Sequence, residues 1–318
     1  MKNCNPAPVS EAHSGAVSRR HALAAMLGAG IWRPGRLAAA DAPVRLIVSE
    51  SLVTDINMND ARAAMQIWIK RMAQDLNVVV EFSPKVFDTT EELLRRTRSG
   101  QFDCVALNVV EYRQIADLLD PSQILCEGNA AGPEQYLLLA KRDSGIQNLG
   151  DLRGRKLCIL KGRKMCVADA WLSTILDEGH FGQSDLFFGP MTAETKASRV
   201  VLPLFFGQTD ACLTSKRSFD TMCELNPQVA KNLTVIASSP AMVVAFYIFR
   251  KNYHGMSRES FAKFYSDLPV TAAGRQIATL FQFDNLMVKD IGVLAPALAV
   301  LEKADRARGR QGIGSRKG

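Results

Sequence analysis

The sequence is poor in the residues that carry out catalysis and bind metals. Its 318 residues include only four histidines, and only His180 and His254 lie beyond residue 40. It contains no C-x-x-C pair, no zinc-ligand spacing, no G-x-S-x-G motif, no P-loop and no G-x-G-x-x-G motif after a predicted strand. We therefore predict a protein that is not an enzyme and that holds no metal and no cofactor.

Long apolar segments are absent beyond residue 40. The longest apolar stretches there, Ala241 to Phe249 and Val293 to Val300, fall well short of the roughly 20 residues that a membrane-spanning helix needs. The apolar share of 47% is nevertheless ample for sizeable cores in a chain of this length. We expect a globular protein without a transmembrane segment after its first forty residues.

The first forty residues read as an export signal. Arg19 and Arg20 precede an apolar run from Ala22 to Ile31, and the small residues Ala38 to Ala40 offer a peptidase site just before Asp41. This arrangement resembles a twin-arginine export signal. We therefore predict that residues 1–40 are a leader, removed near Ala40, and that the protein is periplasmic.

The export route has an alternative. His21 and Ala22 depart from the residues usual after the twin arginines, so a general secretory signal remains open. Arg33 and Arg36, after the apolar run, favour the twin-arginine route, which tolerates positive charge there. A membrane anchor is a further alternative, although the apolar run is too short to span a bilayer.

The body of the chain has no excess of positive charge. The leader holds five of the 39 basic residues and one of the 32 acidic ones, and residues 303–318 hold six basic residues and only Asp305. Residues 41–302 therefore carry 28 basic and 30 acidic residues, which gives nucleic-acid binding little support. The tail, 303–318, has no apolar period and is expected to be disordered.

Six cysteines lie beyond the leader. Cys104, Cys158 and Cys212 fall inside predicted buried strands, where a cysteine behaves as a small apolar residue. Cys166 stands at a predicted helix start beside Lys164, where we expect a lowered thiol pKa. Because no histidine partner is recognisable, a cysteine enzyme is only a remote third alternative. Disulfide pairing stays open, since an exported protein could pair its cysteines.

Beyond the leader, predicted strands and helices alternate as in an α/β protein. The predicted strands are 44–49, 78–82, 104–107, 136–140, 157–160, 186–188, 211–214, 233–237 and 243–249. The predicted helices are 60–76, 89–99 with Thr89 or Thr90 as cap and Gly100 at the end, 110–119, 167–176, 194–206, 219–225, 257–268, 271–280 and 289–303.

The passage from Gln135 to Leu160 suggests a chain that leaves one lobe and opens another. An apolar run, Tyr136 to Ala140, is followed by a polar turn, a short helical turn from Leu149 to Gly154, and a second buried strand from Leu157 to Leu160. This order is similar to the crossing passage of type II periplasmic solute-binding proteins.

Three further passages carry a closer resemblance. They are Glu92 to Asp103, with an L-x-x-G-x-x-D-like helix-to-strand pattern; Arg142 to Ile146 together with Asp151 to Gly154; and Phe206 to Ala211. In this order and spacing they resemble the phosphate/phosphonate/phosphite-binding branch of the type II periplasmic binding proteins, over residues 44–300. These proteins are the soluble receptors of ABC importers.

The resemblance implies a two-lobed α/β fold, in which each lobe is a mostly parallel sheet flanked by helices. Residues 41–139 plus 241–302 would form lobe 1, and 140–240 would form lobe 2, joined by a two-strand hinge. The resemblance also implies a monomer that binds a small molecule between the lobes and delivers it to an ABC permease. A periplasmic sensor that presents its closed form to a membrane signalling protein is the alternative.

The ligand should lie beyond the carboxyl ends of the strands, where helix amino-termini favour anions. Four loops reach this position: 49–59, 107–112, 161–167 and 214–218. The third places Lys161, Arg163 and Lys164 beside a helix start, which suits a carboxylate, sulfate or phosphate group. That these cations form only a solvated turn is the alternative.

The resemblance weakens at the residues that would hold a phosphonate. Phosphonate-binding members carry Ser-Thr-Ser-Gly where this chain has Lys164 to Val167, so a different anion or a larger organic ligand is equally open. Tyr112 matches a tyrosine of the family, but it could equally cap a core. The candidate ligand-binding residues are Ser51, Thr54, Asn108, Tyr112, Lys164, Met165, Cys166, Thr214 and Ser215.

Other polar residues of these loops have simpler interpretations. Asn57, Asn59 and Asp60 are expected to cap the first long helix rather than to touch a ligand, and Asn108 could close a turn. Asp55 would repel an anion.

Overall fold

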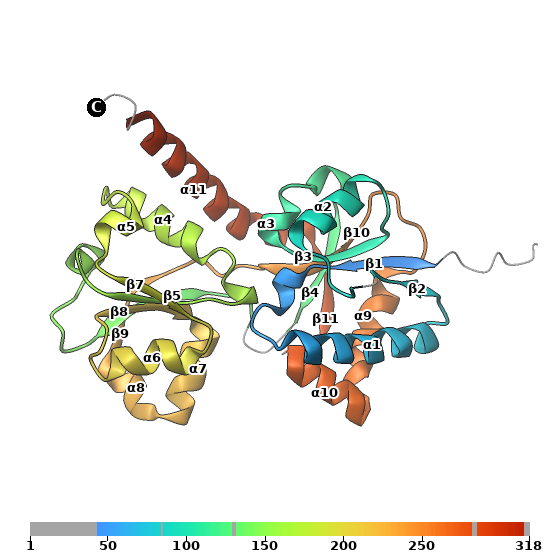
Figure 1. Ribbon diagram of the computed structural model, residues 1–318, viewed down its shortest axis with the longest axis horizontal. Coiled ribbons are helices and arrows are strands. Elements are labelled where there is room, and N and C mark those ends of the chain that lie inside the picture. Colours follow the sequence, from blue (N-terminus) through green and yellow to red (C-terminus); the bar gives the residue numbers. More distant parts are fainter. Residues whose placement is uncertain (1–42, 84, 129–131, 282–284, 315–318) are drawn as a thin grey trace, which may run out of the picture. The chain divides into compact units, whose positions relative to one another are not determined.

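The computed structural model describes residues 43–83, 85–128, 132–281 and 285–314, the last five of these by their backbone alone (Figure 1). The predicted leader and its cleavage site near Ala40 lie outside the described residues. Within the described part of the chain, no helix is both long and apolar enough to cross a membrane.

The first sheet has six strands in the order β11-β4-β10-β3-β1-β2. Strands β1 to β4 run in one direction, and β10 and β11 run in the other. Their bounds are β1 Val44–Val48, β2 Val80–Glu81, β3 Cys104–Asn108, β4 Gln123–Glu127, β10 Ala245–Phe249 and β11 Leu286–Asp290.

The second sheet repeats this pattern with five strands in the order β7-β6-β8-β5-β9. Strands β6 to β9 share one direction, and β5 opposes them. Their bounds are β5 Tyr136–Lys141, β6 Leu157–Leu160, β7 Met191–Glu194, β8 Ala211–Ser215 and β9 Leu233–Ser238.

In each sheet, one opposed strand belongs to a segment that has just crossed from the other sheet. The segment after β4 crosses to become β5, and the segment after β9 crosses back to become β10. The two crossing segments pair with each other, because the N–H groups of Glu134 and Met242 each donate to the other's carbonyl, at 2.8 and 2.7 Å. Strand β5 lies wholly in the second sheet, so the chain changes sheets before Tyr136 rather than at residue 140.

Helices cover the faces of both sheets (Figure 1). The α-helices are α1 Met58–Asp75, α2 Thr90–Arg98, α3 Val109–Tyr112, α4 Ala168–Glu178, α5 Ser184–Phe187, α6 Ala197–Phe205, α7 Lys216–Leu225, α8 Pro227–Asn232, α9 Arg258–Asp267, α10 Ala272–Phe281 and α11 Ala295–Gly314. Short 3₁₀ helices span Glu50–Val53, Ala116–Leu118, Leu149–Leu152, Arg163–Met165, Leu268–Val270 and Ile291–Leu294.

Local sequence explains several of these boundaries. Asn57 caps α1 by accepting hydrogen bonds from the N–H groups of Asn59 and Asp60, as predicted. Thr89 and Glu92 form a capping box at the start of α2, and Gly100, with φ +71°, follows its end. The predictions for this helix are therefore confirmed.

Other predictions of secondary structure are wrong. Residues 186–188 belong mostly to α5 rather than to a strand, and the strand of this region is β7. Residues 110–119 form α3 and a 3₁₀ turn instead of one helix, and strands β4 and β11 were not predicted.

The segment after Lys303 is not disordered as far as residue 314. It continues α11, which buries Ala304 and Ala307. Lys303 pairs with Glu178 of α4 at 2.8 Å, and Arg113 pairs with Asp305 at 2.7 Å. These contacts hold the charged end of the helix against other elements.

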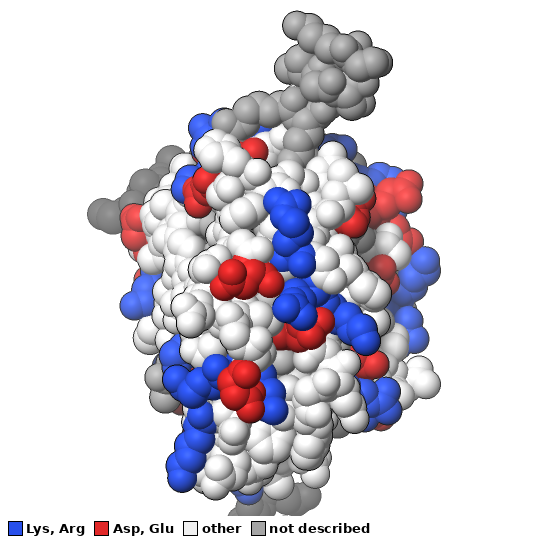
Figure 2. Space-filling view, turned by 90° about the vertical axis from the view of Figure 1, so that its left-hand side faces the viewer, with Lys and Arg blue, Asp and Glu red and all other residues white. Residues whose placement is uncertain are grey.

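Charges of both signs are mixed on the surface. Figure 2 shows lysine and arginine side chains interspersed with aspartate and glutamate on one face, with much of that face uncharged. This distribution agrees with the near balance of charge in residues 41–302.

A buried carboxylate ties three segments of the first sheet together. Asp103 accepts hydrogen bonds from the N–H and guanidinium of Arg45 at 2.9–3.0 Å and from Nε of Arg250 at 2.9 Å. Burial alone would raise the pKa of Asp103, but the hydrogen bonds from Arg45 and Arg250 lower it to about 2. The folded state therefore favours the ionised carboxylate.

We expect Asp103→Asn to lower the free energy of unfolding near neutral pH by about 1 to 2 kcal/mol, since both arginines are partly exposed. Because the folded pKa is depressed, this contribution is present above the unfolded pKa of about 4 and is lost as pH falls toward 2. Urea denaturation from pH 7 to 2 measures it. Asp75→Asn, which removes an exposed pair with Arg71, is the control and should change little. If the free energy of unfolding of Asp103→Asn fell toward pH 2 as steeply as that of the unchanged protein, the low pKa assigned to Asp103 would be wrong.

Candidate functional site

An apolar cavity of about 80 Å³ lies against the first sheet. Strands β1, β4 and β10 and helices α1, α9 and α10 contribute to its wall. The side chains that define it include Val48, Trp68, Phe246, Tyr265, Ile277 and Phe281. A cavity with this lining favours the hydrocarbon part of a ligand.

The loop after β6 of the second sheet supplies the cationic part of the cavity wall, Arg163 and Lys164. Nζ of Lys164 lies 2.6 Å from Oε2 of Glu127 and 3.3 Å from Oε1 of Glu134. Both carboxylates belong to segments outside that loop, so the ion pairs join the loop to the end of β4 and to the crossing segment.

Arg163 is buried and also contacts residues that lie around the first sheet. Its Nη2 donates to the carbonyl of Phe281 at 2.8 Å, and its Nε lies 3.8 Å from Asp55. A Cβ atom at Gly162 would lie 3.3 Å from Oδ2 of Asp55, so a side chain there would crowd this approach. Asp55 therefore faces the cationic loop.

The solvated-turn alternative describes only one of the three cations. Lys161 lies at the surface and pairs with Asp169 at 2.6 Å. The side chains of Arg163 and Lys164 are only 5% and 15% exposed. The structure thus brings two of the predicted cations to the cavity, each already in contact with carboxylates.

A buried glutamate that the sequence analysis did not single out organises the first two loops. Glu111 accepts hydrogen bonds from Oγ of Ser49 at 2.6 Å, Oγ1 of Thr90 at 2.7 Å, and Oγ of Ser51 and the N–H of Asn108, both at 3.1 Å. Asn108 caps α3 in a capping box with Glu111. The N-x-x-E spacing was the available signal for this pair.

The predicted residues Ser51 and Asn108 are therefore engaged within the protein. Nδ2 of Asn108 donates to Oγ of Ser51 at 3.0 Å, and Ser51 in turn bonds to Glu111. Thr54 is exposed and ends a 3₁₀ turn. Tyr112 is half-buried and packs edge-on against Phe246, with ring centroids 5.5 Å apart. The core-capping interpretation of Tyr112 agrees with this contact.

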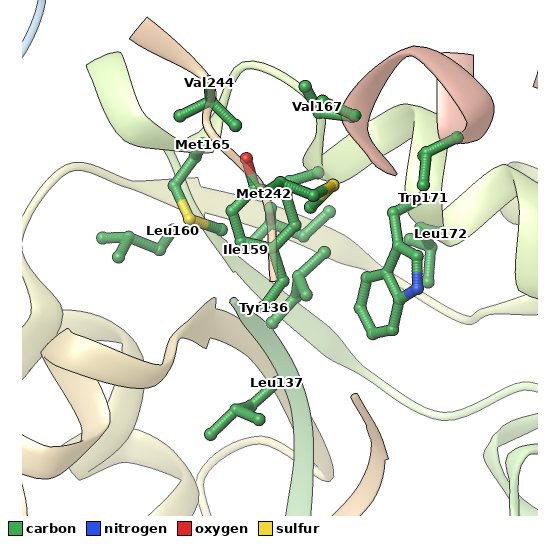
Figure 3. Packing of buried hydrophobic residues seen from close by; sticks show 14 of the residues in the cluster. Tyr136, Leu137, Ile159, Leu160, Met165, Val167, Trp171, Leu172, Met242 and Val244 are labelled. Atoms are coloured by element: carbon green, nitrogen blue, oxygen red, sulfur yellow. The ribbon is translucent and has the colours of Figure 1, made fainter. Parts of the chain in front are cut away.

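Met165 is a core residue rather than part of the cavity wall. Figure 3 shows its side chain beside Leu160 and close to Val244, among buried apolar residues. Nearby, the hydroxyl of Tyr136 donates to the carbonyl of Lys164 at 2.8 Å and fixes the backbone of the loop.

Cys166 is not a thiolate. Burial of its thiol, together with the negative charges of Glu111 and Glu134, raises its pKa to about 12. The expectation of a lowered pKa is wrong, because desolvation and these carboxylates outweigh the helix start and Lys164. All six cysteines of the described residues are free, and Cys104, Cys158 and Cys212 are buried in strands, as predicted.

The fourth predicted loop contains donors without partners. Ser215 caps α7 through the N–H of Ser218. Oγ1 of the fully buried Thr214, and Nε and Nη2 of Arg217, have no hydrogen-bond partner among the described residues. Arg217 was not singled out from the sequence, although it lies within the predicted loop 214–218.

Two further N–H groups without partners belong to residues of the cavity wall. They are Nη1 of Arg163 and Nε1 of Trp68, both buried, and neither has a partner in the described ranges. Unpaired buried donors are costly, so they mark positions where a ligand or water would be stabilised. The described residues contain no group of three or more His, Cys, Asp or Glu side chains that could hold a metal.

We expect Cys166 to resist alkylation in the folded protein. At pH 8 a thiol with a pKa of about 12 has on the order of a thousandfold less thiolate than an ordinary cysteine. Brief treatment with iodoacetamide followed by peptide mass mapping should therefore modify Cys223 well before Cys166. Equal rates at the two positions would contradict the raised pKa of Cys166, and denatured protein provides the control in which both react.

Comparison with solved structures identifies the fold. A Xanthomonas citri protein bound to ATP is 12% identical, with a TM-score of 0.55 over 84% of this chain and 98% of its own. PhnD1 from Prochlorococcus marinus, in complex with methylphosphonate, is 11% identical, with a TM-score of 0.54 over 82% and 98%. A binding-protein component of an ABC phosphonate transporter from Pseudomonas aeruginosa is 12% identical, with a TM-score of 0.50 over 87% and 100%. The predicted type II periplasmic binding protein fold is confirmed.

No curated protein matches the chain. A family model described as "ABC transporter, phosphonate, periplasmic substrate-binding protein" matches residues 51–288, about three quarters of the sequence. Members of this family bind substrates and are not enzymes, and nothing in the comparisons supports the sensor alternative. The chain belongs to the family of periplasmic substrate-binding proteins of phosphonate-type ABC transporters.

Proposed function

We propose that this protein captures a small anion in the periplasm, a phosphonate, phosphate-like or other oxyanion, and delivers it to an ABC permease. The observation that carries the proposal is the set of buried donors without partners among the described residues, namely Arg163 in the loop after β6, Thr214 near the end of β8 and Arg217 in the first turn of α7. These positions lie at or near the carboxyl ends of parallel strands, where open α/β sheets bind their ligands. An acidic group is the ligand chemistry that such guanidinium groups recognise.

The proposed binding position is the cavity whose wall contains Arg163 and Lys164. Lys164 stays a predicted ligand contact at this cavity, and we add Arg163. Thr214 stays a predicted contact from the end of β8, outside the residues that line the cavity. Four other predicted residues are engaged within the protein, because Ser51, Asn108 and Ser215 make internal hydrogen bonds and Met165 packs in the core. The methylphosphonate complex of PhnD1 supports an anionic ligand by analogy.

Capture would follow from movement of the two sheets about the paired crossing segments. We propose that the first sheet with its helices and the second sheet, from β5 to β9, with its helices act as two lobes of a monomer. A ligand that touches both the first sheet and the Arg163 loop binds better when the lobes are close together, and it therefore stabilises the closed form. We further propose that the predicted leader exports the chain by the twin-arginine route.

A thermal-shift screen tests the proposal with phosphate, phosphite, methylphosphonate, sulfate, methanesulfonate, acetate and butyrate. Ligand that binds only the folded state adds about 2.7 kcal/mol at one hundred times its Kd, which corresponds to a rise in Tm of several degrees. We expect at least one anion to produce this rise and Arg163→Gln to abolish it.

Arg199→Gln is the matched control, because Arg199 is exposed and its nearest carboxylate, Glu194, lies 3.7 Å away. Arg163→Lys keeps the positive charge. A thermal shift that Arg163→Lys retains and Arg163→Gln loses therefore depends on that charge and not on folding. A shift that survives in a folded Arg163→Gln protein would disprove the assigned site. The absence of a shift with every anion would disprove anion capture.

A further inference from the structure

The hydroxyl cluster at the carboxyl ends of β1 and β3 is already filled by a carboxylate of the chain itself. Ser49, Ser51 and Thr90 are hydroxyl donors within 3.1 Å of Glu111, and Glu111 is only 2% exposed. Such a group of donors would otherwise suit a free oxyanion. With Glu111 in place, a second anion there would meet like charge in a buried setting.

The cations at the cavity are similarly committed. Lys164 contacts Glu127 and Glu134, and Arg163 contacts Asp55. Three carboxylates therefore surround two cations. A dianion such as a phosphonate would add two further negative charges, whereas a carboxylate adds one and needs fewer donors.

The space next to these charges is apolar and small. Its volume of about 80 Å³ is roughly half that of an engineered cavity of 150 Å³ that binds benzene. By proportion it accommodates about three carbons. Nη1 of Arg163, which has no partner among the described residues, supplies a donor at its wall.

We propose that the ligand is a short-chain aliphatic monocarboxylate, whose hydrocarbon part of about three carbons fills the cavity and whose carboxylate accepts a hydrogen bond from Arg163, and that phosphonates are rejected. This inference rests on the proposed capture of an anion, and it narrows that capture to one ligand class. The chain's own carboxylates, Glu111, Glu127 and Glu134, determine the selectivity. A pocket of this kind discriminates by offering few unpaired donors to additional oxygens and by repelling a second negative charge.

Isothermal titration calorimetry tests the ligand class with two series of matched chain length. The first series is acetate, propionate, butyrate, valerate and hexanoate, and the second is methyl-, ethyl-, propyl- and butylphosphonate. We expect the Kd of the carboxylates to fall about fourfold per added methylene, up to butyrate or valerate, and then to stop falling. Each phosphonate should bind at least tenfold more weakly than the carboxylate with the same alkyl group.

Two variants on α10 separate cavity filling from general effects on the helix. Ile277→Phe places a larger side chain at the cavity wall and should remove the gain in affinity from acetate to butyrate. Ala273→Leu adds a side chain of similar size at an exposed position of the same helix and should preserve it. A gain that persists unchanged in a folded Ile277→Phe protein would overturn the cavity as the site of the alkyl chain.

Failure of this inference can be told apart from failure of the proposed function. Phosphonates that bind as tightly as the matched carboxylates, with loss of binding in Arg163→Gln, would overturn the ligand class and leave anion capture intact. If neither series binds, both proposals are wrong. Glu127→Gln adds an independent check, because removing one carboxylate beside Lys164 should strengthen phosphonate binding more than carboxylate binding, and equal effects would argue against charge-based rejection.

Discussion

Nζ of Lys164, in the loop after β6, lies 2.6 Å from Glu127 and 3.3 Å from Glu134. Glu127 ends β4, and Glu134 lies on the segment that leads into β5. The side chains of Lys164 and Glu134 are only 15% and 9% exposed, so loss of this cation would leave the carboxylate of Glu134 buried without it. This pairing holds the loop after β6 against the first sheet and brings Arg163 to the cavity wall. Arg163, the other cation of this loop at the cavity, is also held by its own contacts with the carbonyl of Phe281 and with Asp55.

The family match and the arrangement of the site answer different questions. Fold and family follow from the two sheets with one strand-order pattern and from the match over residues 51–288. The ligand depends on a few side chains, and here several polar groups that could bind an oxyanion are bonded to Glu111 instead. The architecture that this protein shares with phosphonate receptors therefore does not by itself determine its ligand.

The sequence predicted those features that depend on nearby residues. Continuous apolar runs predicted β6 and β8 closely, and the Thr89 cap was recognisable from Glu92 three residues later. The position of the cationic loop followed from the rule for parallel strands. The partners of its cations could not be predicted, because Glu127 is 37 residues from Lys164 and Phe281 is 118 residues from Arg163. Burial of the Cys166 thiol likewise depends on contacts that the local charge pattern does not contain.

Glu134 connects the candidate site to the crossing between the sheets. Its backbone pairs with Met242 on the returning segment, while its side chain lies beside Lys164. In the proposed movement of the two sheets, a ligand whose acidic group draws Lys164 away weakens the Lys164–Glu134 contact, so that binding acts on the proposed hinge. A ligand held by the first sheet alone would bind the open and closed forms with the same affinity. Such a ligand would leave the equilibrium between the two forms unchanged. In the proposed mechanism, contact with the Arg163 and Lys164 loop is therefore what couples ligand binding to closure.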